Sequence, residues 1–136
     1  MFHTVRYSLL VLATFLLVVC SGCSEKMPYK VVPFEGTITF KGEPLENVSL
    51  EFAVGDYRSS SAFVAEGSQG KFETIHSPGV RGVPIGTCKM TVSWVGSEFD
   101  TPPAGLAEVL AKYGYGTDGY VFEVTKAEKD FKIDLE

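Results

Sequence analysis

Apolar and polar side chains alternate along several short stretches of the chain between residues 31 and 136. Alternation with a period of two is typical of a β-strand that has one face on a core and the other face in solvent. In VSLEFAV, for example, Val48, Leu50 and Phe52 share one face. The pattern predicts seven short strands, at 36–42, 48–54, 61–66, 71–76, 87–94, 120–125 and 129–135.

The connections between the predicted strands are short and contain turn residues. KGEPLEN (41–47) and GSQG (67–70) carry glycine or proline and suit hairpins, and KAE (126–128) suits a tight turn. Strands with one apolar and one polar face belong to antiparallel sheets that cover a core on one side. The predicted fold class is therefore all-β, a seven-stranded antiparallel β-sandwich, with a barrel as the alternative.

One segment has a helical period instead. In TPPAGLAEVLAKYG (101–114), apolar residues from Leu106 to Tyr113 recur at the spacing i, i+3, i+4, i+7. Thr101 suits the N-cap of a helix, and Gly114 suits its end. The pattern predicts one short amphipathic helix in the crossover between the fifth and sixth strands, where its apolar stripe covers an open end or edge of the sandwich.

The first 22 residues differ from the rest of the chain. Residues 1–7 carry Arg6 and no acidic residue, and residues 8–19 (SLLVLATFLLVV) contain no charge. A basic start, a short apolar core and small residues after it describe a secretory signal peptide. The apolar run is shorter than the about 20 residues that a membrane-spanning helix needs. We predict a cleaved signal peptide over residues 1–22, and an N-terminal membrane anchor that stays attached is the alternative.

Cys20 and Cys23 form a C-x-x-C pair at the end of this segment. Such a pair is also typical of redox dithiols and of half a zinc site. Ser21 and Gly22, directly before Cys23, resemble the lipobox of bacterial lipoproteins, although Cys20 stands where that motif usually has leucine. The resemblance implies that Cys23 is the lipid (palmitate) attachment site and the first residue of the mature chain. Residues 23–30 are then a tether, and residues 31–136 are the domain.

The motifs of the domain follow one another as in a known family. FEGTITFKGEPLENVSLEFA, GKFET, GVPIGTCKMTVSW and AKYGYGTDGYVFEVTKAEKDFKIDL resemble small planctomycete-type bacterial lipoproteins with a carboxypeptidase-regulatory-like domain. The resemblance covers residues 31–136, nearly the whole mature chain. It implies a seven-stranded transthyretin-like (prealbumin-like) sandwich, in agreement with the strand pattern.

The net charge and the number of histidines argue against some classes of function. The net charge of −5 argues against nucleic acid as a partner, and no basic run suits anionic lipid. His76 is the one histidine after the signal peptide, whereas a zinc site needs three or four ligands, so no metal or cofactor is expected. We interpret His76 as an exposed turn residue. Cys88, on the apolar face of 87–94, is interpreted as a buried free thiol.

Large aromatic residues flank the predicted helix on both sides. Trp94 and Phe99 precede it, and Tyr113 and Tyr115 lie at its exit. Together these four residues are candidates for a stacking surface that takes a sugar or a peptide. The alternative is that they pack the helix against the rim of the sandwich.

These observations lead to an expected function without catalytic residues. We expect a non-catalytic, lipid-anchored module that binds or scaffolds at the cell envelope, held at the membrane through lipid on Cys23. Its partner would be an envelope protein or a glycan. A carbohydrate- or peptide-binding domain that uses the crossover aromatics is the alternative. A hydrolase that uses His76 is a second alternative, although the sequence contains no G-x-S-x-G motif to support it.

Overall fold

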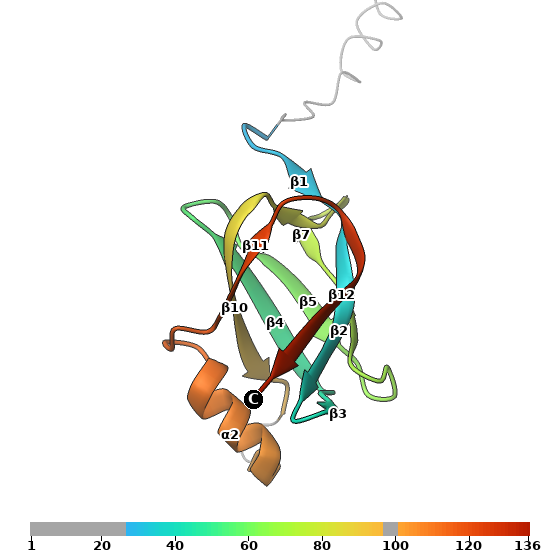
Figure 1. Ribbon diagram of the computed structural model, residues 1–136, viewed down its shortest axis with the longest axis vertical. Coiled ribbons are helices and arrows are strands. Elements are labelled where there is room, and N and C mark those ends of the chain that lie inside the picture. Colours follow the sequence, from blue (N-terminus) through green and yellow to red (C-terminus); the bar gives the residue numbers. More distant parts are fainter. Residues whose placement is uncertain (1–26, 97–100) are drawn as a thin grey trace, which may run out of the picture.

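Two β-sheets that face each other form the body of the molecule (Figure 1). The computed structural model describes residues 27–96 and 101–136. The elements in chain order are β1 (Val31–Val32), β2 (Phe34–Phe40), β3 (Glu43–Pro44), β4 (Val48–Val54), β5 (Ser60–Val64), β6 (Lys71–Glu73), β7 (Ile75–Ser77), β8 (Val80–Arg81), β9 (Val83–Pro84), β10 (Gly86–Trp94), α2 (Ala104–Tyr113), β11 (Tyr120–Val124) and β12 (Glu128–Leu135).

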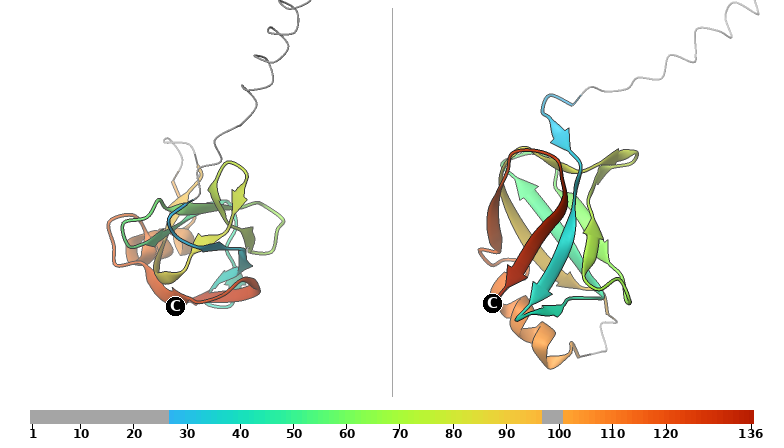
Figure 2. Two further views of the ribbon diagram at one scale, coloured as in Figure 1. Left: turned by 90° about the horizontal axis from the view of Figure 1, so that it is seen from above. Right: turned by 45° about the vertical axis from the view of Figure 1, so that its right-hand side comes forward.

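The larger sheet has the strand order β11-β10-β4-β5-β7-β8. The smaller sheet has the order β12-β2-β3, and β6 also pairs with β2. A short ribbon of β1 and β9 lies at one end of the sandwich and α2 at the other, as the views in Figures 1 and 2 agree. The predictions of an all-β sandwich and of one short helix in the crossover between β10 and β11 are confirmed.

One strand pair departs from the predicted antiparallel arrangement. β12 lies parallel to β2, with Ile133 beside Ile38 and Leu135 beside Phe40. β11 and β12 follow each other along the chain, yet β11 joins the larger sheet and β12 the smaller one. The connection between them therefore crosses from one layer to the other and does not close a hairpin. Alternation shows which face of a strand is buried, and it carries no information on the strand's neighbour.

The predicted strand 71–76 is divided between the two sheets. β6 pairs with β2 in the smaller sheet, whereas β7 pairs with β5 in the larger one. Thr74 lies between them and is fully buried. Its backbone N–H and its hydroxyl both donate to the carbonyl oxygen of Phe34, at 3.1 and 2.7 Å. The chain thus changes layers at Thr74, and the GSQG turn before it joins strands of different sheets.

Five phenylalanine rings lie together between the two sheets. Phe34, Phe72 and Phe131 come from the smaller sheet, and Phe52 and Phe122 come from the larger one. The centroid of the Phe34 ring lies 4.8 Å from that of Phe131, 5.7 Å from Phe122 and 6.3 Å from Phe52. These separations fall in the range of about 4.5–7 Å in which aromatic pairs attract each other. The cluster therefore joins the two layers.

Helix α2 lies at the end of the sandwich away from β1 (Figure 1). Its N-cap is Pro103, and no side chain caps it, so the predicted cap at Thr101 is wrong. Two prolines follow Thr101 directly, and each proline disfavours helical backbone angles in the residue before it. Leu106 and Val109 form the buried stripe of the helix, and Gly114 ends it as predicted.

Substitution of Gly36 by Ala should destabilise the fold strongly. A Cβ atom on Gly36 would lie 1.9 Å from the carbonyl oxygen of Phe131 and 3.1 Å from the ring of Phe72. Because the first of these is a backbone atom, relief of the contact requires β2 to separate from β12. We expect the free energy of unfolding, measured by urea titration, to fall by at least about 2 kcal/mol.

Gly105→Ala is the matched control for this substitution. A Cβ atom on Gly105 meets nothing within 4 Å, and the residue lies in α2. Alanine favours the helix over glycine, so the free energy of unfolding should rise by about 0.5 kcal/mol or stay level. Similar losses in the two variants would contradict the close approach of β12 to Gly36.

Candidate functional site

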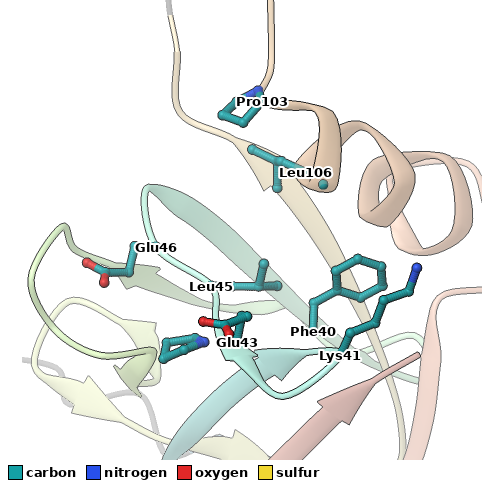
Figure 3. Close-up of a pocket in the computed structure, with 9 residues that line it drawn as sticks. Phe40, Lys41, Glu43, Leu45, Glu46, Pro103 and Leu106 are labelled. Carbon is teal, nitrogen blue, oxygen red and sulfur yellow. The ribbon is translucent and has the colours of Figure 1, made fainter.

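A groove lies at the α2 end of the sandwich, between the β2–β3 turn and the start of α2 (Figure 3). Its volume is about 390 Å³, within the range of about 300–1,000 Å³ that is typical of ligand sites. The residues that line it are Phe40, Lys41, Glu43, Pro44, Leu45, Glu46, Pro103, Gly105 and Leu106. The groove is thus built from two segments far apart in the sequence.

The floor of the groove is apolar. Phe40, Leu45 and Leu106 are 7, 9 and 8 % exposed, so each presents a small part of its side chain. In Figure 3, Leu106 reaches from α2 toward Leu45 and Phe40 on the opposite side. Pro44 and Pro103 extend the same apolar surface at the edges. Such a floor favours an apolar group as ligand, because a charge placed there would lose its hydration.

A tight turn places the β3 side of the groove. Lys41 and Gly42, directly after β2, have φ angles of 50° and 83°. Positive φ at both central residues is characteristic of the turns that match the twist of a hairpin. The chain returns along β2, and the backbone N–H of Leu45 donates to the carbonyl oxygen of Ile38 at 3.1 Å. This bond holds Leu45 beside Phe40 in the floor.

Charged side chains stand at the rim of the groove. The Nζ atom of Lys41 lies 2.9 Å from Oε1 of Glu108 on α2, and both side chains are more than half exposed. An exposed pair of this kind stabilises a protein little. The Glu46 carboxylate accepts a hydrogen bond from the backbone N–H of Gly67, and Glu43 is exposed. A polar rim around an apolar centre is the usual composition of a protein-binding surface.

Two of the predicted site residues pack against the core near α2. Trp94 at the end of β10 is half-buried, and its indole ring covers Gly96, where a Cβ atom would lie 2.1 Å from the ring. Tyr113 at the end of α2 is half-buried too, and its hydroxyl donates to the carbonyl oxygen of Glu136 at 3.2 Å. Both rings therefore contribute to packing at this end of the sandwich.

Tyr115 lies apart from these two residues. Its side chain is 90 % exposed, and it lines a hollow on the outer face of the larger sheet. Among the described residues, no stacked or edge-on ring pair includes Trp94, Tyr113 or Tyr115. The remaining predicted site residues, Phe99 and Cys23, lie outside the part of the chain that the structure describes.

His76 is buried, and the prediction that it lies exposed in a turn is wrong. Its side chain is 3 % exposed. Ser60 Oγ lies 2.8 Å from its Nδ1 atom, and the hydroxyl oxygen of Tyr29 lies 2.7 Å from its Nε2 atom. In either neutral tautomer one ring nitrogen donates and the other accepts, and a hydroxyl can serve either role. The change of layers at Thr74 turns Ile75 outward and His76 inward.

No pattern in the sequence indicates the partners of His76. Ser60 and Tyr29 are 16 and 47 residues away along the chain. Tyr29 also stacks on Tyr57, with ring centroids 4.1 Å apart, and meets the ring of His76 edge-on at 5.5 Å. The segment before β1, predicted as part of the tether, is therefore attached to the domain from Tyr29 onward.

The surroundings of His76 favour its neutral form. Burial lowers the pKa of His76 below the usual 6.5, and the positive charge of Arg58 lowers it further. Ser60, its partner at Nδ1, is fully buried. In this conformation the Ser60–His76 pair satisfies the hydrogen-bonding needs of buried polar atoms.

Cys88 is a buried thiol, as predicted. It faces the core from β10 and is fully buried. Burial raises the pKa of Cys88 to about 12. The sulfur therefore stays protonated at neutral pH, and a protonated thiol is a poor nucleophile and a poor metal ligand.

Neither metal ligation nor similarity to known proteins assigns a function. Within residues 27–96 and 101–136, no group of three or more His, Cys, Asp or Glu side chains is placed to hold a metal ion. No helix in these ranges is both long and apolar enough to cross a membrane. No protein-family model, no curated protein and no solved structure matches the chain.

The stability of the protein should depend on pH through His76. Because its pKa is lower in the folded protein than the usual 6.5, the unfolded chain binds a proton first as the pH falls. The free energy of unfolding should therefore decrease below pH 6.5, until the pH reaches the lower pKa of the folded state, and this loss should be absent above pH 6.5. Urea titrations across this range measure the slope.

His76→Gln is the control, since glutamine keeps polar atoms at this position and does not titrate. The variant can be less stable at every pH, and that offset is irrelevant to the test. Its free energy of unfolding should vary less between pH 7 and about 5.5 than that of the wild type. Identical slopes for the two proteins would show that His76 does not titrate differently in the folded and unfolded states.

Proposed function

We propose that the protein is a non-catalytic, lipid-anchored β-sandwich module that binds an apolar segment of a partner protein at the cell envelope. The observation that carries this proposal is the groove between the β2–β3 turn and α2, with its apolar floor and charged rim. An apolar side chain that covers this floor removes its exposed hydrocarbon from water, and burial of apolar surface is favourable.

The position of the groove supports this role. The chain enters the domain at the β1 end, and α2 lies at the opposite end (Figures 1 and 2). The groove is lined in part by α2 and therefore lies at that opposite end. Cys23 is six residues before Tyr29, whose hydroxyl bonds to His76 in the domain. Six residues span at most about 20 Å. Lipid on Cys23 would thus hold the β1 end close to the membrane and direct the groove away from it.

The proposal of a non-catalytic role rests on the chemistry of the polar side chains. The one histidine among the described residues, His76, is buried between two hydroxyls. The one cysteine in these ranges, Cys88, is a buried thiol. Neither side chain is placed to meet a ligand in the groove, whose lining contains carboxylates, one ammonium and apolar groups.

We further propose that the sandwich is of the transthyretin-like type found in carboxypeptidase-regulatory-like domains. The two facing sheets fit the sandwich that the sequence resemblance implies. This assignment and the lipobox resemblance at Cys23 support each other, because both point to small bacterial lipoproteins.

Lipid attachment is tested by the mass of the mature protein. Purified from its native membrane, the chain should begin at Cys23 and carry the added mass of acyl groups. Cys23→Ser should leave the precursor unprocessed and without lipid. Cys20→Ser is the matched control and should be processed like the wild type, because Cys20 leaves with the signal peptide. A mature chain with an unmodified Cys23 would contradict the anchor.

Partner binding is tested by photocrosslinking in the native cells. A benzophenone amino acid at Glu43 or Pro103, both exposed beside the groove, should crosslink to one envelope protein, at a segment rich in apolar residues. The same amino acid at Lys126, which is exposed between β11 and β12, should give no such product.

Substitutions at Gly105 provide the matched pair for this experiment. Gly105 lines the groove, and a side chain placed there meets nothing within 4 Å. Gly105→Trp should fill the groove and reduce the crosslink at least about tenfold, the ratio that corresponds to 1.4 kcal/mol. Gly105→Ala should leave it unchanged. Crosslinks of equal yield from Glu43, Pro103 and Lys126, or none from any of them, would overturn the proposal.

A further inference from the structure

A second opening lies on the outer face of the larger sheet. It is a hollow of about 320 Å³ lined by Glu51, Ala53, Lys89, Thr91, Tyr115 and Gly116. Its base consists of neighbouring residues of β4 and β10, since Lys89 pairs with Ala53 and Thr91 pairs with Glu51. The groove at the α2 end is lined by a different set of residues. The two openings are therefore separate sites.

Tyr115 stands beside this hollow on an ordered turn. The hydroxyl of Thr117 donates to the carbonyl oxygen of Gly114 at 2.7 Å, and the N–H of Gly119 donates to the Thr117 hydroxyl at 3.1 Å. Gly116 has a φ angle of 83°, which glycine adopts without strain. The turn thus has a defined shape, and it leaves the Tyr115 side chain 90 % exposed. A ring presented in this way is available to a ligand.

Lys89 links the base of the hollow to the same turn. A Cβ atom on Gly119 would lie 3.2 Å from Cγ of Lys89 and 3.3 Å from Cε, so the lysine stem runs along Gly119. This contact restrains the side chain without burying its ammonium group. Within the described residues, neither Lys89 nor Glu51 takes part in an ion pair. Both charged groups are therefore free to bond a ligand.

We propose that this hollow binds a neutral saccharide. A pyranose ring has one face covered by C–H groups, which packs on the negative face of an aromatic ring such as Tyr115. Its hydroxyl groups both donate and accept, and the base offers the Lys89 ammonium as donor, the Glu51 carboxylate as acceptor and the Thr91 hydroxyl as either. The charges of Lys89 and Glu51 cancel, so the site has no net attraction for a charged ligand.

The strand order argues against a peptide at this site. Peptides that bind to sheets add a strand at a free edge, through backbone hydrogen bonds. β10 lies between β11 and β4, and β4 lies between β10 and β5. Their backbone groups are therefore engaged in the sheet, and recognition falls to side chains. Side-chain recognition of hydroxyl groups is what a saccharide requires. The proposal does not depend on the function of the groove.

The proposal is tested by NMR titration of the full chain in a non-glycosidic detergent. The probes are three neutral tetrasaccharides, cellotetraose, maltotetraose and tetra-N-acetylchitotetraose. At least one of them should cause saturable shifts in the amide signals of Ala53, Thr91 and Gly116, and leave those of Leu45 and Leu106 in the groove unchanged. Tyr115→Ala should raise the Kd at least about tenfold, as expected for a residue that dominates a binding site.

Two matched variants show whether the aromatic ring of Tyr115 itself is responsible for the loss of affinity. Tyr115→Phe keeps the ring and should retain most of the affinity. Phe63→Ala removes another exposed ring from the larger sheet, outside the hollow, and should bind like the wild type. No saturable shift with any of the three sugars, or a Tyr115→Ala variant that binds as tightly as the wild type, would overturn the saccharide site. Either result leaves the crosslinking test of the groove unaffected.

Discussion

The packing of phenylalanine rings between the two sheets is the interaction on which the rest of the structure depends. Phe34 lies at the centre of the cluster and meets rings from both layers. Among the described residues there is no disulfide and no metal cluster, so burial of apolar surface has to join the sheets. Truncation of one buried phenylalanine lowers the free energy of unfolding by about 3–5 kcal/mol. The whole free energy of unfolding of a domain is about 5–15 kcal/mol. Each of the three buried rings, Phe34, Phe52 and Phe72, is thus a large part of the stability.

The rings occupy the middle of the sandwich, and its two ends differ in the kind of contact that they contain. At the β1 end, buried polar atoms are satisfied by the contacts of Tyr29 and Ser60 with His76, which also attach the preceding segment to the domain. At the α2 end, the helix leaves part of the floor uncovered and the groove remains. The hollow beside Tyr115 lies on the outer face, where the side chains do not contribute to the core. The hollow therefore uses residues outside the core, whereas the floor of the groove consists of core residues, Phe40, Leu45 and Leu106.

The strands were predictable because their signal is local. Val48, Leu50 and Phe52 share the buried face of β4, as the alternation predicted, since successive side chains of any strand point to opposite sides. The layer change at Thr74 was not predictable, because it depends on a bond to Phe34, 40 residues away. The same holds for His76, whose burial follows from that layer change. Of the candidate aromatics, the sequence identified Tyr115 without indicating that it stands apart from Trp94 and Tyr113.

The sequence by itself determined the all-β class, the buried face of most strands and the presence of a short helix before Gly114. These properties depend on which residue types stand a few positions apart in the sequence. A periodic pattern contains information of this local kind and no other. Only the tertiary structure decided that β12 runs parallel to β2, that His76 lies inside, and that Leu45 and Leu106 meet across a groove. Each of these depends on contacts between segments that are far apart along the chain, and a pattern of a few neighbouring residues does not contain such contacts.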